Sequence, residues 1–296
     1  MKISVLTPTH NRVDLLPKLY QSLKENNRQE IEIEWLIMDD GSTDSTQNKI
    51  EELKKENIIE IHYFYQENQG KMVAINQLVE KAKGEFIIEC DDDDYFTTNA
   101  FQTIQKTCKK YREKKDIYGF CFLKYDQEGK NMGNLFSQKE TTMFDLYFRE
   151  GETGEKAIVF FSEIRKQYKH QLEKHEKFIT EARMYHEMDL KRHLITINEP
   201  IMICEYQKEG YTKNYSKQCK ENPFGYYQYF KEILEHDMKK VLFSKRLYAI
   251  KHYILFTELT KTKKALQNIK GFQNKMWYIL LYIPGILKTK VKFRRN

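Results

Sequence analysis

The stretch EFIIECDDDDYF, residues 85–96, decides how the rest of this chain is interpreted. Its apolar run Phe86–Ile88 is typical of a buried strand, and it is followed by four consecutive carboxylates at 91–94. Ligands of open α/β sheets bind at the carboxyl ends of the strands, which is where these aspartates would lie. Hard divalent cations such as Mg²⁺ and Mn²⁺ prefer carboxylate oxygens and complete their coordination with water and phosphates. The alternative is a solvated acidic turn, which the flanking apolar residues disfavour.

Upstream of this stretch, apolar strands alternate with amphipathic helices. Leucines at positions 15, 16, 19 and 23 recur at the spacing of one helix face, and residues 68–70 turn into a further helix that runs to Ala82. Over the first hundred residues this alternation predicts a parallel sheet flanked by helices. The expected strands are Lys2–Leu6, Ile31–Met38, Ile58–Tyr65 and Phe86–Ile88.

Polar clusters follow three of these four strands. The carboxyl ends of neighbouring parallel strands lie along one edge of a sheet, so we expect the three clusters to face one crevice. One polar strand end is only a loop, whereas several that share a crevice form a site. The clusters are Thr7–Arg12, Asp39–Asp44 and Asp91–Asp94.

Side chains of this crevice have the chemistry to hold a nucleotide diphosphate and a metal ion. Asp40 can accept a hydrogen bond from a base or a ribose hydroxyl. Asp91 can reach a ribose or a metal-bound water, and Asp93 can bind the metal directly. Lys71, at the start of a helix, offers a positive charge to a phosphate, although a solvated surface lysine is the alternative.

The length of 296 residues suits one large α/β domain with an extension. The domain is expected over residues 1–215, as a nucleotide-binding half at 1–100 and a second half at 101–215 that includes a strand at Lys156–Phe161. Helical periodicity predicts a C-terminal extension at 216–296. Its expected helices are Tyr226–Leu234, Met238–Leu259 and Thr262–Ile269.

The composition favours a folded cytoplasmic protein. Hydrophobic residues make up 40% and charged residues 31%, which excludes a disordered chain. The five cysteines are scattered and include no C-x-x-C pair, so we expect reduced thiols and neither a disulfide framework nor a zinc site. The chain starts on a strand pattern, without the features of a signal peptide. No apolar run approaches the roughly 20 residues of a membrane-spanning helix.

Four segments, in this order and at this spacing, resemble glycosyltransferase family 2. They are SVLTPTHNR (4–12), WLIMDDGSTD (35–44), NQGKMVAIN (68–76) and the D-x-D element Asp91-x-Asp93 within ECDDDDYF. The resemblance is clearest over residues 1–100 and continues more loosely to about Gly210. It implies the GT-A nucleotide-diphospho-sugar transferase fold, a Rossmann-like and mostly parallel sheet flanked by helices, here followed by the helical extension.

The resemblance also implies roles for individual residues. Asp40 would contact the base. Asp91 and Asp93 would form the metal-binding D-x-D, with Asp93 as the direct ligand of Mn²⁺ or Mg²⁺. The residues expected to bind the nucleotide sugar are Thr7, Pro8, Thr9, Arg12, Asp40, Lys71, Asp91 and Asp92.

A catalytic base is expected in the second half of the domain. Members of the family usually have a Glu-Asp pair at the start of a helix there, which this sequence lacks. Glu181 of FITE takes the position of the aspartate and is our prediction, with Glu187 and Asp189 as the alternatives. A solvated glutamate on an amphipathic helix is the competing interpretation of Glu181. His175 and His186 are expected to be surface or supporting residues.

The implied activity is an inverting, metal-dependent hexosyl- or N-acetylhexosaminyltransferase. It would move one sugar from a nucleotide diphospho-sugar, expected to be a UDP-sugar, to a hydroxyl of a saccharide or lipid-linked saccharide in cell-surface polysaccharide synthesis. The Q-x-x-R-W element of processive members is missing, which predicts single-sugar addition. Two other interpretations stay open. A nucleotidyltransferase would need a glycine-rich phosphate loop that TPTHNR lacks, and an inactive sugar-nucleotide-binding or scaffold protein would need no base.

The segment 276–296 combines apolar residues with a basic end. It predicts an anchor on an anionic leaflet, at the inner face of the cytoplasmic membrane. A packing helix with a solvated basic end is the alternative. Nucleic-acid binding is not expected, because no recognition motif accompanies these charges. The basic residues are Lys288, Lys290, Lys292, Arg294 and Arg295.

Overall fold

The computed structural model describes residues 1–26, 30–173, 175–205 and 215–294, with side chains to residue 283 in the last range. The chain forms two compact units. The sheet unit comprises residues 1–143, 152–170 and 184–207, and the helical unit comprises 144–151, 171–183 and 208–296. Two short segments of the helical unit therefore precede residue 215 in the sequence. The predicted division into 1–215 and 216–296 stays a prediction.

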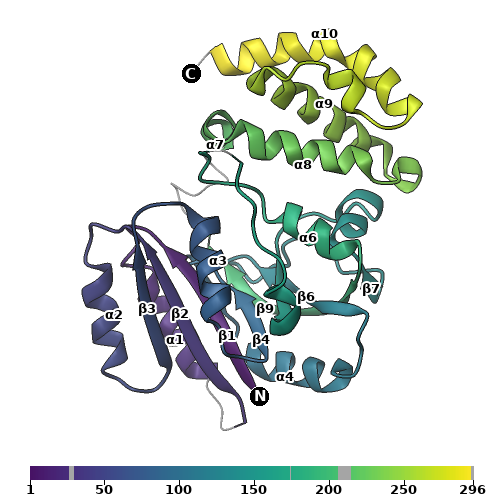
Figure 1. The fold of residues 1–296 in the computed structure, drawn as a ribbon. Helices are drawn as coiled ribbons and strands as arrows, with labels where there is room; N and C mark the ends of the chain where they lie inside the picture. The colour runs from purple at the N-terminus through teal and green to yellow at the C-terminus, as the bar shows by residue number, and fades with distance from the viewer. Residues whose placement is uncertain (27–29, 174, 206–214, 295–296) are drawn as a thin grey trace. The chain divides into compact units, whose positions relative to one another are not determined.

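Four parallel strands and the three helices between them begin the sheet unit (Figure 1). Their spatial order is β3-β2-β1-β4, and the predicted alternation of strands and helices is confirmed. Pro17 falls in the first turn of α1, where its missing N–H is not needed. The elements are β1 (Lys2–Thr9), α1 (Leu16–Asn26), β2 (Glu32–Asp40), α2 (Thr46–Lys54), β3 (Glu60–Gln66), α3 (Lys71–Lys81) and β4 (Phe86–Glu89).

Two of these strands extend into the polar clusters that were predicted to follow them. β1 continues to Thr9 and β2 to Asp40, and the last pair in their parallel register is Thr9 with Asp39. Backbone pairing tolerates polar side chains when they find partners. Thr7, which is fully buried, accepts a hydrogen bond from Trp35 Nε1 at 2.9 Å. Part of the expected nucleotide loop is therefore strand.

The remaining strands complete a single nine-stranded sheet whose described order is β3-β2-β1-β4-β8-β6-β9-β5, with β7 paired to β9. β8 runs antiparallel to both β4 and β6, and β5 runs antiparallel to β9. The predicted strand Lys156–Phe161 is confirmed as β8. The other elements are β5 (Asp94–Phe96), α4 (Ala100–Tyr111), β6 (Ile117–Tyr125), β7 (Glu140–Thr141), α5 (Ser162–Arg165), α6 (Ala182–Asp189) and β9 (His193–Cys204).

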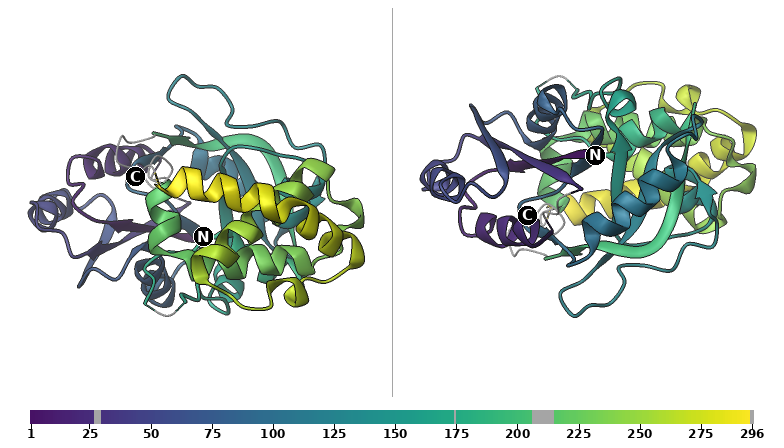
Figure 2. Two further views of the ribbon diagram at one scale, coloured as in Figure 1. Left: turned by 90° about the horizontal axis from the view of Figure 1, so that it is seen from above. Right: turned by 90° about the horizontal axis from the view of Figure 1, so that it is seen from below.

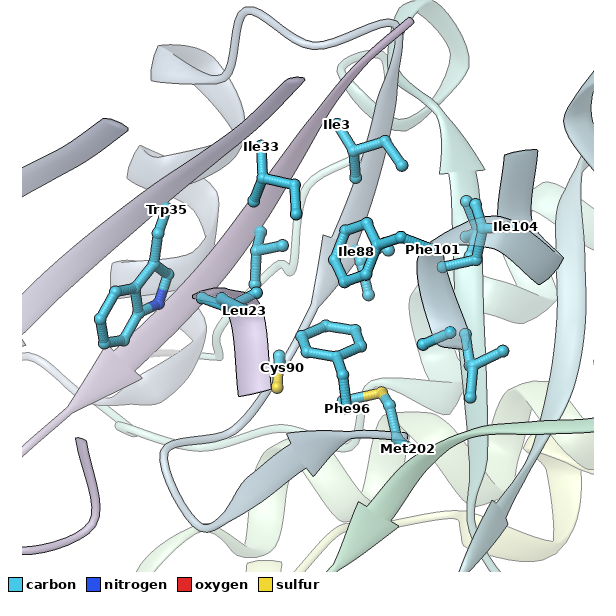
Figure 3. Close-up of a cluster of buried hydrophobic side chains, with 14 of the residues drawn as sticks. Ile3, Leu23, Ile33, Trp35, Ile88, Cys90, Phe96, Phe101, Ile104 and Met202 are labelled. Atoms are coloured by element: carbon cyan, nitrogen blue, oxygen red, sulfur yellow. The ribbon is translucent and has the colours of Figure 1, made fainter. Parts of the chain in front are cut away.

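Helices cover both faces of the parallel half of the sheet, which explains its continuous apolar strands. Side chains of α1, α2 and α4 pack against one face in the largest hydrophobic cluster of the unit. Figure 3 shows part of this cluster, where Leu23, Phe101 and Ile104 meet Ile3 and Ile88. Helix α3 lies on the opposite face, over β1 and β2 (Figure 1). The packed layers hold the carboxyl ends of the strands in fixed positions.

The helical unit contains three long helices that lie side by side, with α9 between α8 and α10 (Figures 1 and 2). Aromatic rings fill its core: Phe230 and Phe256 stack at 5.7 Å, and Tyr227 and Tyr253 stack at 5.5 Å. No described helix is both long enough and sufficiently apolar to cross a membrane. The helices are α7 (Tyr215–Glu221), α8 (Pro223–Glu235), α9 (Phe243–Thr260) and α10 (Phe272–Arg294).

The prediction of a helix at 262–269 is wrong, because most of that segment is irregular. Lys261 and Lys264 adopt left-handed backbone conformations, with φ of 52° and 59°, which end α9 and prevent its continuation. Only a 3₁₀ turn at Ala265–Asn268 remains. The helix predicted at 238–259 is likewise divided, into a 3₁₀ turn at Met238–Lys240 and α9.

Candidate functional site

The four aspartates after β4 alternate between exposed and buried positions. The side chains of Asp91 and Asp93 are 42% and 18% exposed, whereas those of Asp92 and Asp94 are 4% and 3% exposed. Asp94 begins β5, and its N–H donates to Asp91 O at 3.1 Å, which closes a tight turn. The predicted Asp91-x-Asp93 pair is therefore the more accessible pair, and Asp92 and Asp94 are the buried pair.

Three basic side chains from three different elements contact this acidic run. Lys71 Nζ, in the first turn of α3, lies 2.8 Å from Asp91 Oδ2. Arg12 Nη1, beyond the end of β1, lies 2.8 Å from Asp92 Oδ1 and 3.3 Å from Asp93 Oδ2. In the described sheet unit, Asp91, Asp92 and Asp93 are thus each contacted by one of these basic side chains, and the contact to Asp93 is the longest of the three.

The fourth contact comes from a residue that sequence reasoning missed. Lys124 Nζ on β6 lies 2.6 Å from Asp94 Oδ2 and 3.3 Å from Glu155 Oε2, and its side chain is only 10% exposed. Burial lowers the pKa of this lysine, but Asp94 and Glu155 outweigh burial and hold the pKa well above its usual value. A single lysine inside the apolar strand IYGFCFLKY was the available signal. Asp94, Glu155 and Cys204 converge closely enough to suit a metal, yet the lysine already supplies the positive charge.

In the described part of the chain three cations contact the four carboxylates of the run, and one of them, Lys124, is shared with Glu155, so the run is not fully neutralised. Burial, together with the charges of Asp91, Asp92 and Asp94, raises the pKa of Asp93 to about 7. Burial also acts on Asp91, but Lys71 and Lys124 outweigh it and lower the pKa of that carboxyl. A cation bound between the two accessible carboxylates would relieve the repulsion. Oxygen donors of this kind fit a hard divalent metal such as Mg²⁺ or Mn²⁺.

Asp40 holds the start of α3 in place, a role that the sequence did not indicate. Its Oδ1 accepts hydrogen bonds from Gln69 N at 2.7 Å and Gln66 Nε2 at 2.6 Å, and its Oδ2 accepts one from Gly70 N at 2.8 Å. Gly70 has φ of +98°, which favours glycine. These bonds fix the first turn of α3 and with it Lys71. The predicted contact of Asp40 with a nucleotide base stays a prediction.

The structure separates the four residues expected from TPTHNR into two pairs. Thr9 Oγ1 donates to Asp92 Oδ2 at 2.8 Å, so Thr9 and Arg12 both reach the acidic run. Thr7 and Pro8 are buried within β1. All four stay predictions as pocket residues. Asp92, predicted to bind the nucleotide, is engaged by its two protein partners in this structure.

The candidates for the base occupy three different settings. Glu181 directly precedes α6 and belongs to the helical unit, while Glu187 lies within α6 in the sheet unit. Asp189 Oδ1 accepts hydrogen bonds from Tyr118 Oη at 2.9 Å and Met143 N at 3.2 Å, which ties it to the sheet unit. His186 is buried and His175 is exposed. The identity of the base stays a prediction.

The geometry of the strand ends agrees with comparisons to known proteins. The profile described as Glycosyl transferase family 2 matches residues 4–188, more than half of the chain. The chain belongs to glycosyltransferase family 2. Among curated relatives of this family 2 member, an uncharacterised glycosyltransferase, MG060 of Mycoplasma genitalium, is 34% identical over 130 residues, 42% of this chain and 44% of the relative.

A second curated relative is the GalNAc(5)-diNAcBac-PP-undecaprenol beta-1,3-glucosyltransferase of Campylobacter jejuni, 34% identical over 141 residues. That match covers 47% of this family 2 chain and 43% of the relative, so the matched part spans less than half the length of each of these two relatives. Solved structures share the fold. TarS 1-349 of S. aureus with UDP-GlcNAc superposes with a TM-score of 0.67 at 14% identity, covering 100% of this chain and 92% of TarS 1-349.

A mannosyltransferase from Pyrobaculum calidifontis, solved with GDP-Man and Mn²⁺, has a TM-score of 0.57 at 15% identity. It covers 97% of this chain and 83% of its own. At these identities the likeness establishes the fold, and the expected GT-A fold is confirmed. The family match at residues 4–188 thus includes the strand ends that carry the acidic run.

Proposed function

We propose that this family 2 member is an inverting, metal-dependent glycosyltransferase that adds one sugar at a time. The observation that carries the proposal is the accessible pair Asp91 and Asp93, which lies beside the buried and paired carboxylates Asp92 and Asp94 in a run that has more carboxylates than cations in contact with it. The donor is a nucleotide diphospho-sugar, with UDP the expected nucleotide. The complex of TarS 1-349 with UDP-GlcNAc supports this donor class.

Asp91 and Asp93 would hold a Mn²⁺ or Mg²⁺ ion. When bound, such an ion is a Lewis acid that stabilises the negative charge developing on the leaving diphosphate. The Mn²⁺ in the Pyrobaculum mannosyltransferase supports this choice of metal. Lys71 contacts Asp91 and is the first residue of α3, at the positive end of the helix dipole. From there its ammonium group would bind the same diphosphate when the donor is present.

Thr9 and Arg12 shape the neighbouring part of the pocket. Arg12 is held by its ion pair with Asp92. Moving Arg12 away would leave the buried charge of Asp92 without a counter-charge, so Arg12 keeps a fixed positive charge at the side of the pocket. Asp40 both anchors α3 and presents a carboxylate at the strand edge to the nucleotide base. A carboxylate offers about four lone pairs, and Gln66, Gln69 and Gly70 use three of those on Asp40.

The acceptor is a hydroxyl of a saccharide or a lipid-linked saccharide of the cell surface. The Campylobacter relative is named for an undecaprenol-linked saccharide, which supports the lipid-linked class. Such an acceptor would bring the protein to the inner face of the cytoplasmic membrane. The transferred group is a hexose or an N-acetylhexosamine.

Metal removal tests the function directly. UDP release from a panel of UDP-hexoses and UDP-N-acetylhexosamines is measured with Mn²⁺, with Mg²⁺ and after EDTA treatment. We expect release from at least one sugar with metal and a loss of at least 100-fold in EDTA, restored by added Mn²⁺. Undiminished release in EDTA would contradict metal dependence. Binding of UDP-sugars without any release would favour the inactive, sugar-nucleotide-binding interpretation.

Replacing the predicted base should abolish most transfer while leaving donor binding intact. Glu181→Gln keeps the shape of the side chain but cannot take a proton from the acceptor hydroxyl. We expect kcat for transfer to fall about 100-fold, the lower end of general-base contributions. Glu187→Gln and Asp189→Asn are measured in parallel by the same transfer assay. A larger loss in either of them, with Glu181→Gln near wild type, would move the base to that residue.

A further inference from the structure

Helix α10 presents an apolar face to solvent. Phe272, Met276, Ile279, Leu280 and Ile283 are 83%, 39%, 59%, 57% and 71% exposed. At 3.6 residues per turn, these five positions fall within an arc of about 100°. Large aliphatic and aromatic side chains gathered on one helix face are unusual on a protein surface and mark an interaction site.

The other side of α10 is the side that packs within the helical unit. Tyr278 is 6% exposed and lies 6.0 Å from the ring of Tyr253 on α9. Tyr282 Oη donates to Glu258 Oε1 at 3.0 Å. The helix is thus already anchored by one face, and α10 forms the outer layer of the three helices (Figure 2). The exposed residues contribute nothing to this core, so folding alone does not explain them.

Positive charge is concentrated in the same part of the chain. From Leu259 to Asn296 the sequence holds ten lysines and arginines and no aspartate or glutamate. The preceding 258 residues hold 40 basic and 43 acidic side chains, a net charge of −3. Lys261, Lys263 and Lys264, in the connection that leads to α10, are all exposed. The apolar face is therefore part of the most basic region of the protein.

We propose that the apolar face of α10 docks on the surface of an anionic lipid bilayer, with the helix in the plane of the membrane. Exposed aromatic and aliphatic side chains bind membranes through apolar burial, and basic residues in the same segment add attraction to acidic headgroups. A second copy of this chain would bring together two segments of ten positive charges each. A nucleic acid would pair with the lysines but would leave Ile279, Leu280 and Ile283 unused.

The test uses the full chain and vesicles of two compositions. Co-sedimentation is measured with phosphatidylcholine alone and with phosphatidylcholine containing about one third phosphatidylglycerol, which gives the vesicles a negative surface potential. We expect at least tenfold stronger partitioning to the anionic vesicles. Ile279→Glu with Ile283→Glu should reduce that partitioning at least tenfold.

A matched control separates the apolar face from net charge. Leu135→Glu with Leu190→Glu makes the same change in charge at residues that are 59% and 75% exposed in the sheet unit. This control should bind anionic vesicles within about threefold of wild type, because its glutamates lie outside the docking helix. Circular dichroism and UDP release without vesicles check that both variants fold, so a failure of docking is distinguished from a failure of the proposed reaction.

Four outcomes would overturn the proposal. One is equal loss of binding in both double variants, and another is no preference for anionic vesicles. The third is a concentration-dependent dimer, seen by analytical ultracentrifugation, that Ile279→Glu with Ile283→Glu dissociates, since a second copy would then cover this face. Tight binding to a nucleic acid that the same double variant weakens would overturn it equally.

Discussion

Asp93→Asn is expected to lower kcat/KM for sugar transfer from the UDP-sugar about 10³-fold, because one of two accessible carboxylates loses its charge. Asp93 is the member of the acidic run with the longest contact to a cation, 3.3 Å to Arg12. Three carboxylates of the run stay paired in the variant. The side chain remains nearly isosteric, so the loss would reflect chemistry and not folding. Steady-state kinetics at saturating Mn²⁺ measure this effect.

The control for this variant is Glu128→Gln, which also removes one carboxylate from the sheet unit. Glu128 is 72% exposed and pairs with Lys130 on the surface. Its loss should leave kcat/KM within about twofold of wild type, because exposed ion pairs contribute little. An Asp93→Asn enzyme within tenfold of wild type would show that the proposed metal pair is misassigned.

Lys124→Met is expected to lower the free energy of unfolding by about 3–5 kcal/mol, the typical cost of removing one partner of a buried ion pair. Asp94 is 3% exposed and its closest cation is Lys124 at 2.6 Å. Methionine keeps most of the aliphatic volume, so packing changes little while Asp94 and Glu155 lose their counter-charge. Urea unfolding followed by circular dichroism measures the difference.

Lys130→Met is the matched control, because it removes a lysine that is 73% exposed. Its effect on the free energy of unfolding should stay below about 1 kcal/mol. If the two variants unfolded at the same urea concentration, Lys124 would not be the residue that neutralises Asp94. Another group would then have to compensate the charge of Asp94.

Periodicity predicted the strands and helices of the parallel half, but not where the strands end. Turn-forming residues such as Thr7 and Asp39 were expected to begin loops. Their backbones instead stay paired in the β1–β2 register, because tertiary pairing outweighs local preference. The same limit applies to the helix expected at 262–269. The pattern of apolar residues does not predict that a residue such as Lys264 adopts a left-handed backbone conformation.

The sequence predicted where the acidic run lies, at the end of β4, but not the partners of its aspartates. The register of the D-x-D element came from the resemblance, because four consecutive aspartates do not indicate one by themselves. The structure distinguishes the four by exposure, with Asp92 and Asp94 buried. Their partners Arg12 and Lys124 are distant in sequence, so no local pattern could pair them. Asp40 shows the same limit, because its hydrogen bonds to Gln69 and Gly70 depend on the packing of α3 against the sheet.

The most direct test of the account is a Mn²⁺ titration followed by electron paramagnetic resonance, with UDP present and absent. We expect one Mn²⁺ site in the wild-type chain, with an affinity that increases when UDP is added. Binding should be at least tenfold weaker in Asp93→Asn and unchanged in Glu128→Gln. Equal Mn²⁺ affinity in all three proteins, with or without UDP, would contradict the claim that the carboxylates after β4 hold a metal against the diphosphate of the donor.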